Sequence, residues 1–100
     1  MFARVSQYEA PSEKLEAAVA GFEAATAALE RMDGIERAYL LVNRRDGKAL
    51  TITVWDSEEA MAASAEKATQ LRSDSIAAAQ GKVLAVDSYE VAVQRDFRRG

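Results

Sequence analysis

The side chains that could hold a ligand are guanidinium, hydroxyl, amide and aromatic groups at alternate positions of three apolar segments. Alternate residues of a β-strand point to the same face of a sheet, so a sheet built from these segments would gather such groups on one face. This mixture suits a cavity with apolar walls and a few polar groups that select the ligand. The candidate substrate-binding residues are Arg4, Ser6, Tyr8, Arg37, Tyr39, Asn43 and Trp55.

The composition limits the chemistry that these groups can perform. The chain has 100 residues and contains neither histidine nor cysteine. These absences exclude disulfides, thiolate or imidazole metal ligands, cysteine nucleophiles and histidine-based proton transfer. We therefore expect no metal and no cofactor. No general base is evident on the candidate face; Asp87 and Glu90 are the available carboxylates, and exposed strand positions are the simpler interpretation of both.

The charge pattern and the apolar runs restrict the possible partners and the location. The chain carries 13 basic and 16 acidic residues, a net charge of -3, which disfavours a nucleic-acid partner because phosphate binding needs a basic surface. No apolar run approaches the roughly 18 to 20 residues of a membrane span, and the N-terminus does not resemble a signal peptide. We expect a cytoplasmic protein without a membrane partner, with one domain over residues 1–96 and a basic tail over residues 97–100.

Hydrophobic periodicity and turn residues predict the order strand, helix, strand, strand, helix, strand. The first helix is expected to begin at an N-cap, Ser12, and to end before Gly34, and an Asp46-Gly47 turn is expected to join the central strands. This is the βαββαβ order of a ferredoxin-like α+β fold with a four-stranded antiparallel sheet. The predicted strands cover residues 2–9, 35–45, 49–55 and 83–95, and the second helix begins near Ser57 with an interruption at residues 73–75.

Two helices can cover only one face of such a sheet. Along each predicted strand, the alternate positions that carry aliphatic residues are predicted to lie beneath the helices. The candidate ligand-binding residues occupy the other positions and are predicted to lie on the uncovered face. A dimer interface and a ligand cavity are both open interpretations of that uncovered face, and a homodimer is expected for a chain this short. In the last strand the alternation of apolar and polar residues is not kept along its whole length, which predicts a β-bulge. The residues predicted beneath the helices are Ala3, Val5, Ala38, Leu40, Val42, Leu50, Ile52 and Val54.

The junction between the third strand and the second helix carries a family resemblance. Its sequence is Thr51-Ile52-Thr53-Val54-Trp55-Asp56-Ser57-Glu58-Glu59-Ala60, a strand that ends in tryptophan and runs into an acidic helix start. It resembles the antibiotic biosynthesis monooxygenase-like domains of the dimeric α/β-barrel group. The resemblance implies a homodimer in which two sheets form a barrel and each uncovered face lines a pocket, with Trp55 as one wall. Haem-degrading members use a histidine ligand, which this chain lacks.

The resemblance implies cofactor-independent oxidation of an aromatic or quinol-type small molecule. Such a reaction needs an anionic, electron-rich substrate to meet dioxygen in a dry pocket. Arg4 or Arg37 would supply positive charge, and Trp55 would supply a flat wall. Active members often present an asparagine from the first strand, where this chain has Ser6 or Gln7. The alternative hypothesis is a non-catalytic dimer of the same fold that binds or senses a small ligand. The groups expected to hydrogen-bond substrate oxygens are Tyr8, Tyr39 and Asn43.

Overall fold

A computed structural model describes residues 1–97, and the basic residues Arg98 and Arg99 of the predicted tail lie outside this range. The four strands form one antiparallel sheet in the order β2-β3-β1-β4. This order confirms the ferredoxin-like prediction. The elements are β1 (Phe2–Glu9), η1 (Ser12–Lys14), α1 (Leu15–Leu29), β2 (Ile35–Asn43), β3 (Lys48–Trp55), α2 (Glu58–Ala63), α3 (Ala65–Ala78) and β4 (Lys82–Glu90).

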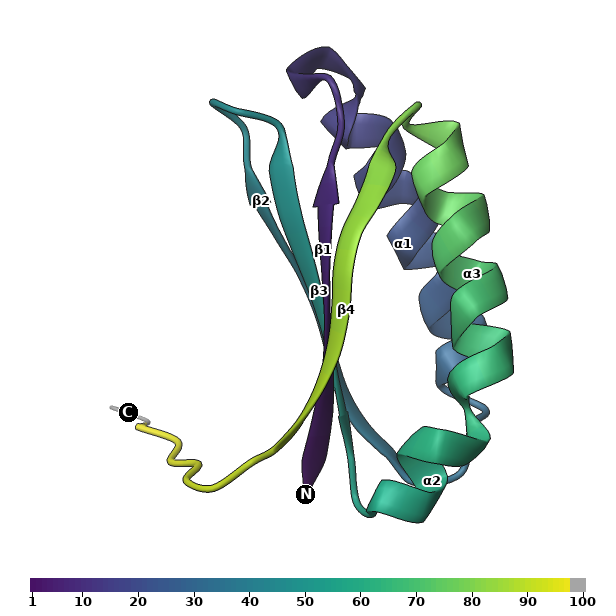
Figure 1. Cartoon of the computed structure of the whole chain (residues 1–100), viewed down its shortest axis with the longest axis vertical. Helices are drawn as coiled ribbons and strands as arrows, with labels where there is room; N and C mark the ends of the chain where they lie inside the picture. The colour runs from purple at the N-terminus through teal and green to yellow at the C-terminus, as the bar shows by residue number, and fades with distance from the viewer. Residues whose placement is uncertain (98–100) are drawn as a thin grey trace.

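The helices lie on one side of the sheet. Figure 1 shows α1 and α3 side by side along one face, with α2 at the end of the sheet where β3 leaves it. Within residues 1–97 the other face carries no helix, and the segment after β4 turns toward that side. A cluster of Ala10, Leu15, Ala18 and Ala79 is buried where β1, α1 and the end of α3 meet. The sheet therefore has a covered face and an open face, and the two are used as names below.

The turns form where their residues predict them. Gly47 has a φ of +77°, a conformation that favours glycine, and its carbonyl accepts a 2.9 Å hydrogen bond from the backbone N–H of Ala10. A side chain at this position would collide with the Ala10 carbonyl oxygen. At the start of α2, the Ser57 side chain accepts a 3.1 Å hydrogen bond from the N–H of Ala60, as expected for an N-cap. Both predictions are confirmed.

Several predicted boundaries are wrong. The first helix ends at Leu29 and not directly before Gly34, and the second strand ends at Asn43 and not at residue 45. Ser12 begins a 3₁₀ turn and caps no helix with its side chain. The second helical region breaks at Ser64 and not at residues 73–75, because the Ser64 hydroxyl donates to the Met61 carbonyl oxygen and competes with the helical backbone. Residues 73–75 continue α3 with Ser73 and Asp74 exposed to solvent. The last strand ends at Glu90, and residues 91–97 follow without regular structure.

The predicted assignment of the two sheet faces is wrong for β1 and β3. Residues directly opposite each other in a sheet point to the same face, and Leu40 lies opposite Thr51 while Tyr39 lies opposite Ile52. Across the four-residue turn 44–47, odd-numbered residues of β2 lie opposite even-numbered residues of β3. The residues that share a face therefore have odd numbers in one strand and even numbers in the other. The covered face holds Arg4, Ser6, Tyr8, Thr51, Thr53, Ala38, Leu40 and Val42, and the open face holds Ala3, Val5, Leu50, Ile52 and Val54.

The predicted bulge in the last strand is confirmed. Gln7 of β1 lies opposite Ala85, whereas the next residue, Tyr8, lies opposite Val83. One residue of β4, Leu84, is therefore extra, and a β-bulge of this kind changes which parity faces a given side. Leu84 contributes to the open face beside Leu41.

Candidate functional site

A cavity of about 70 Å³ lies between the covered face of the sheet and helices α1 and α3. The strands supply polar groups, among them Arg4, Ser6 and Tyr8, and the helices supply mainly apolar walls such as Phe22 and Leu71. No carboxylate is among the residues that line it within the described chain. The arrangement combines apolar walls with a few hydrogen-bonding groups, as ligand cavities do. Three of the residues predicted for the uncovered face, Arg4, Ser6 and Tyr8, therefore lie at a cavity of the covered face.

Arg4 is held beneath α2 by two hydrogen bonds. Its Nη2 donates to the carbonyl oxygen of Met61 at 2.7 Å, and its Nη1 donates to the Ser64 hydroxyl at 3.2 Å. Burial, and next the positive charge of Arg72, lower the pKa of Arg4. The guanidinium stays protonated at neutral pH, because even a lowered arginine pKa starts from a very high value. Arg4 is thus a fixed positive charge at the cavity.

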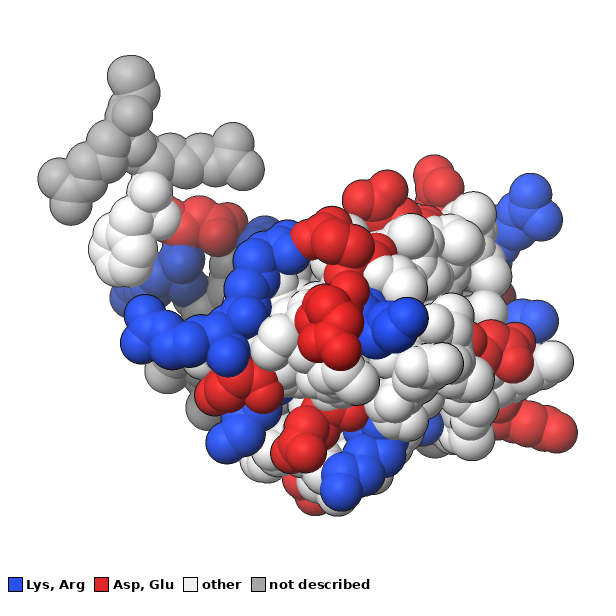
Figure 2. Space-filling model, turned by 90° about the horizontal axis from the view of Figure 1, so that it is seen from above, with Lys and Arg blue, Asp and Glu red and all other residues white. Residues whose placement is uncertain are grey.

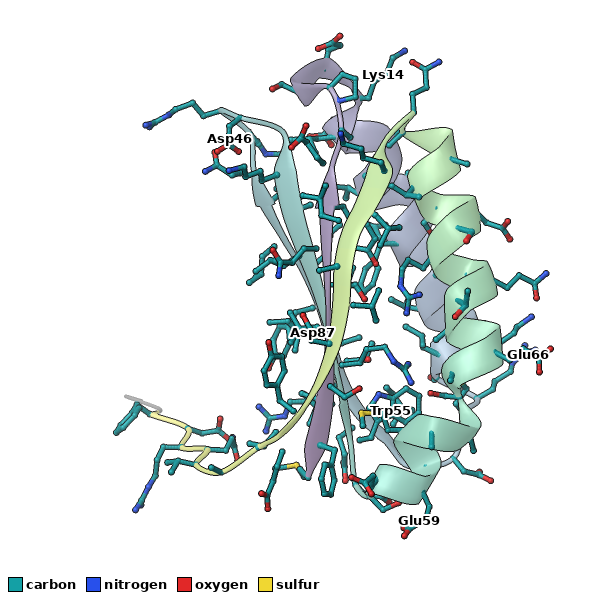
Figure 3. The ribbon with its side chains drawn as sticks, viewed as in Figure 1. Lys14, Asp46, Trp55, Glu59, Glu66 and Asp87 are labelled. Atoms are coloured by element: carbon teal, nitrogen blue, oxygen red, sulfur yellow. The ribbon has the colours of Figure 1, made fainter. Side chains whose placement is uncertain are left out.

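Trp55 supports this charge from behind the cavity lining. Its ring is fully buried, and its Nε1–H donates to the Thr53 hydroxyl at 3.0 Å. The guanidinium carbon of Arg4 lies 5.9 Å from the ring centroid, within the range of a cation–π interaction. Figure 3 shows Trp55 on the helix side of the sheet. Arg4 and Thr53 line the cavity and Trp55 does not, so the ring orients residues of the wall.

Two further polar pairs line the cavity. The Nε of Arg72, on α3, donates to the Ser6 hydroxyl oxygen at 3.2 Å, and the Ser6 side chain is almost fully buried. The hydroxyl groups of Tyr8 and Thr51 are hydrogen-bonded to each other at 2.8 Å. Each hydroxyl group has both donor and acceptor capacity. The cavity therefore presents two guanidinium groups and several hydroxyl groups to whatever enters it.

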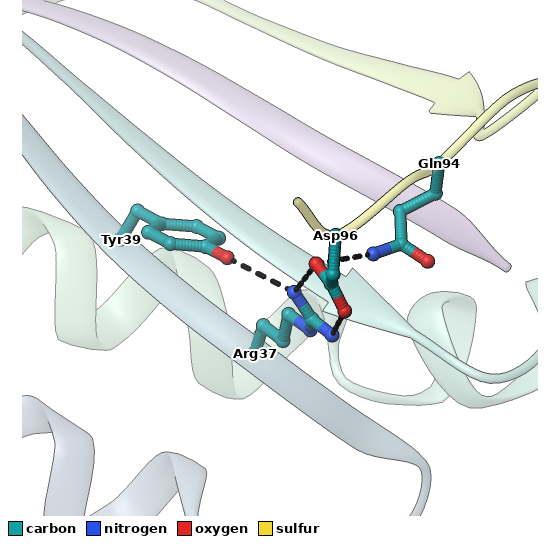
Figure 4. Close-up of polar contacts among 4 residues, drawn as sticks. All are labelled: Arg37, Tyr39, Gln94 and Asp96. Carbon is teal, nitrogen blue, oxygen red and sulfur yellow. Dashed lines mark hydrogen bonds and ion pairs between the residues drawn. The ribbon is translucent and has the colours of Figure 1, made fainter. Parts of the chain in front are cut away.

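Three of the predicted ligand-binding residues lie elsewhere. Arg37 and Tyr39 are exposed on the open face, where Arg37 donates to both carboxylate oxygens of Asp96 at 3.3 and 3.5 Å (Figure 4). Asn43 ends β2, and its side-chain oxygen accepts a 3.0 Å hydrogen bond from the N–H of Arg45 in the turn. The structure therefore brings Arg4, Ser6, Tyr8 and Trp55 together and separates Arg37, Tyr39 and Asn43 from them.

The carboxylates considered as general bases are also outside the cavity. Asp87 and Glu90 are exposed on β4, and neither lines the cavity. Asp87 lies opposite Val5, which places it on the open face. No described residue of the cavity is a carboxylate that could accept a proton from a ligand.

Arg72 is the site residue that the sequence reasoning missed. All the candidate residues lie on predicted strands, whereas the second helical region carries apolar residues at helical spacing, among them Ala68 and Leu71. Arg72 adjoins Leu71 and lies four residues after Ala68, a spacing that places it on the same side of a helix. A cation on the sheet-facing side of a helix was therefore visible in the sequence.

The open face exposes several large apolar side chains. Leu41 is 48% exposed and Tyr89 54% exposed, and a shallow hollow at Leu41 is also lined by Leu50 and Leu84, with Gln7, Asn43 and Lys48 at its edge. Exposed apolar surface of this extent marks an interaction site more often than an ordinary solvated face. The charged side chains of the face drawn in Figure 2 are mixed in sign. None of the described helices is long and apolar enough to cross a membrane.

Comparison with known proteins adds family evidence to this geometry. The model of the family described as antibiotic biosynthesis monooxygenase matches residues 1–80. An uncharacterised protein of Mycobacterium tuberculosis, Rv2557, is 35% identical over 100 residues that cover 98% of this chain and 44% of the relative. The chain thus spans less than half the length of this curated relative.

Solved structures share the fold at low sequence identity. A Deinococcus radiodurans protein described as a candidate antibiotic biosynthesis monooxygenase superposes with a TM-score of 0.75, at 18% identity over 99% of this chain and 100% of its own. A mutant of SnoaB, a cofactor-independent oxygenase of Streptomyces nogalater, gives 0.72 at 17% identity over 93% and 94%. The haem degrader MhuD of Mycobacterium tuberculosis gives 0.65 at 20% identity over 96% and 100%.

Proposed function

Because the chain belongs to the antibiotic biosynthesis monooxygenase family, we propose that it oxidises an aromatic or quinol-type small molecule with dioxygen and without a cofactor, in the cavity of the covered face. The observation that carries this proposal is the pair of guanidinium groups, Arg4 and Arg72, at a cavity whose helix walls are mainly apolar and whose described lining has no carboxylate. Fixed positive charge in a dry site stabilises an anion such as a phenolate or enolate.

The reaction can be written for an anthrone as the type substrate. The ring methylene loses one proton, and the resulting enolate donates electrons to dioxygen and forms a carbon–oxygen bond. The peroxide that results loses water, so one oxygen atom ends in the new quinone carbonyl and the other in water. The methylene carbon supplies both hydrogens of that water and all four electrons that reduce dioxygen, because its two C–H bonds are replaced by a C=O double bond. Arg4 and Arg72 would stabilise the enolate, and the apolar helix walls would exclude water.

The missing carboxylate determines how the substrate is ionised. With no carboxylate in the described lining of the cavity, the substrate loses its proton to bulk solvent before the dry cavity encloses it. The two positive charges lower the substrate's own pKa, because an opposite charge nearby favours the ionised form. We expect the rate to rise with pH through this lowered substrate pKa and then to level off. A bell-shaped profile would instead indicate a protein acid and base.

The size of the cavity requires one element to move. A volume of about 70 Å³ is smaller than the roughly 150 Å³ of an engineered cavity that holds benzene, so a ring compound must displace part of the wall. Helix α3 contains no fully buried residue, whereas α1 buries Leu15, Ala18, Ala25 and Leu29. We therefore expect α3 to shift outward when a ligand enters.

We also propose that the protein is a homodimer formed through the open face. The chain exposes 6622 Å², whereas a compact monomer of 10.9 kDa exposes about 5,600 Å². The excess of about 1,000 Å² includes the extended segment after β4 and is comparable with the roughly 800 Å² that each partner buries in a standard interface. Light scattering at micromolar concentration is expected to give the mass of two chains, and the mass of one chain would refute this proposal.

A second candidate function is ligand binding without catalysis. The absence of a carboxylate from the described lining favours it, because oxidation then depends wholly on ionisation of the substrate. Both functions would use the same cavity. They differ only in whether the bound compound is oxidised.

Oxygen uptake separates these functions. Purified protein is incubated in air with anthrone and a series of hydroquinones at pH 6 to 10, and dioxygen consumption and quinone absorbance are recorded together. Catalysis is expected to exceed the buffer rate for at least one compound, with an Arg45→Gln variant, altered in the exposed turn, as the control. Binding detected by a thermal shift without any turnover above the buffer rate would reject the oxidation and support the binding module.

A further inference from the structure

We propose that the natural ligand of this cavity carries a carboxylate on or beside its ring, and that Arg72 and the Ser6 hydroxyl bind that carboxylate. This inference rests on the proposed function in one respect, namely that the ligand occupies the cavity of the covered face. It adds a charged group to the ligand and assigns two residues to it.

Arg72 has the free hydrogen-bonding capacity that such a role requires. Its one hydrogen bond to a described residue runs from Nε to Ser6, and its two terminal nitrogens make none within residues 1–97. Neither of the ion pairs in this range includes it. A guanidinium group with free terminal N–H groups can bind both oxygens of a carboxylate at once. Arg72 lies at the cavity with this fork unused.

Arg4 is less suited to the same role, because each of its two terminal nitrogens already makes a hydrogen bond within the fold. They donate to the Met61 carbonyl oxygen and to the Ser64 hydroxyl, and they join β1 to the end of α2. Arg4 adds a fixed positive charge, whereas Arg72, on a helix without buried residues, can adjust to a ligand. The two arginines therefore have different roles, one structural with a long-range charge and one binding.

The charge balance of the cavity points to an anionic ligand. Two cations line one cavity without a carboxylate partner among the described residues, and the repulsion between them contributes to the lowered pKa of Arg4. Like charges in a partly buried site are unfavourable unless an anion enters. A bound carboxylate would remove this penalty.

The donor count favours a carboxylate over a phosphate. The Ser6 hydroxyl oxygen accepts the bond from Arg72, and its own proton remains available to donate to a ligand. Together with the fork of Arg72 this gives about three donors, which satisfies the two oxygens of a carboxylate. A phosphate group offers three oxygens and a higher charge, more than Arg72 and the Ser6 hydroxyl alone would satisfy.

The test compares an acid with its neutral counterpart. The probes are 2,5-dihydroxybenzoate and its methyl ester, which share the hydroquinone ring and differ in the charged group. Their dissociation constants are measured by calorimetry at pH 7.5, where the carboxyl group is ionised. We expect the acid to bind about tenfold to hundredfold more tightly than the ester, the range that a charge-assisted pair supports. Equal binding, or tighter binding of the ester, would overturn the inference.

Variants then locate the effect. Arg72→Gln is expected to remove the preference for the acid while leaving ester binding within about twofold, and Arg72→Lys to retain part of the preference because it keeps the charge without the fork. Arg45→Gln, which removes a charge from the exposed turn, should change neither constant. If Arg72→Gln weakens acid and ester equally, Arg72 is part of the wall and the assignment fails. The comparison of the two probes on the unaltered protein stands even if a variant does not fold.

The outcomes are distinct from those of the proposed oxidation. A tenfold preference for the acid without oxygen uptake rejects the oxidation and keeps the carboxylate site. Turnover of neutral quinols with no preference for the acid keeps the oxidation and rejects the site. Tighter binding of phenyl phosphate than of benzoate would also reject it, because the site would then select phosphate.

Discussion

The covered face of the sheet carries buried polar side chains, and the open face carries exposed apolar ones, which is the reverse of the usual distribution. On the covered face, beneath the helices, Arg4, Ser6 and Tyr8 are each less than 9% exposed. On the open face, Leu41 and Leu84 are each nearly half exposed. Burying polar groups costs free energy unless each is hydrogen-bonded, and exposing large apolar groups forgoes hydrophobic stabilisation.

The inversion has a different explanation on each face. The buried polar groups of the covered face are hydrogen-bonded, and no buried side-chain nitrogen or oxygen among the described residues lacks a partner. They surround a cavity, which an ordinary core would fill with apolar side chains. The open face exposes large apolar and aromatic side chains, among them Leu41 and Tyr89. This contrast supports the two proposals made above, a ligand in the covered face and a second chain on the open face.

The largest effect is expected from breaking the covered face at Trp55. Replacing Trp55 by alanine removes a fully buried ring and its contact with Arg4, which should lower the free energy of unfolding by about 3 to 5 kcal/mol. Urea denaturation followed by circular dichroism measures the change, since the only tryptophan is lost. Trp55→Phe keeps most of the volume and should cost less than half as much. A loss below about 1 kcal/mol for the alanine variant would show that the ring is not part of the packed core.

A second effect, of intermediate size, should be confined to the open face. Leu41→Lys places a charge at the centre of the apolar surface, where Leu41 lies opposite Leu50. We expect the dimer dissociation constant to rise about a hundredfold, since burying a charge without a partner is unfavourable, with little change in the circular dichroism spectrum. Analytical ultracentrifugation over a concentration series measures the constant. Ala77→Lys, on an exposed position of α3, is the matched control and should leave it unchanged.

The same comparison explains what the sequence could and could not predict. Element order and most turns follow from local signals. Gly47 adopts the positive φ of a turn, and Ser57 accepts a hydrogen bond from a free N–H at the start of a helix. The faces depend on register between strands, which parity within one strand does not contain. A slip of one residue reverses every side chain of a strand. Counting the residues of the turn 44–47 would have placed Leu40 beside Thr51.

The chemistry of the site was predicted in part for the same reason. Arg4, Ser6 and Tyr8 of β1 line one cavity, as expected of alternate residues in a strand. Hydrophobic patterning predicts that the aliphatic residues of each strand lie beneath the helices. This general rule fails for a sheet face that lines a cavity with polar walls. Arg72 contributes from a helix 66 residues away from Ser6 in the chain. A contact of this separation follows only from the packing of α3 on the sheet.

The smallest effect concerns the segment after β4, which Arg37 holds against the open face through Asp96. Hydrogen bonding and the charge of Arg37 lower the pKa of the Asp96 carboxyl group. A lowered carboxyl pKa means that the contact stabilises the folded chain at pH values above the ordinary aspartate pKa, and that the contribution is lost as the pH falls through the lowered value. Because both side chains are nearly half exposed, the contribution should be small and weaken with added salt.

NMR titration of the Asp96 carboxyl carbon should show the lowered pKa in the unaltered protein and a return toward the ordinary value in Arg37→Gln. Tyr39→Phe, which removes only the longer contact to Arg37, should leave most of the shift, and an unchanged titration in Arg37→Gln would show that the segment does not rest on the open face through this pair.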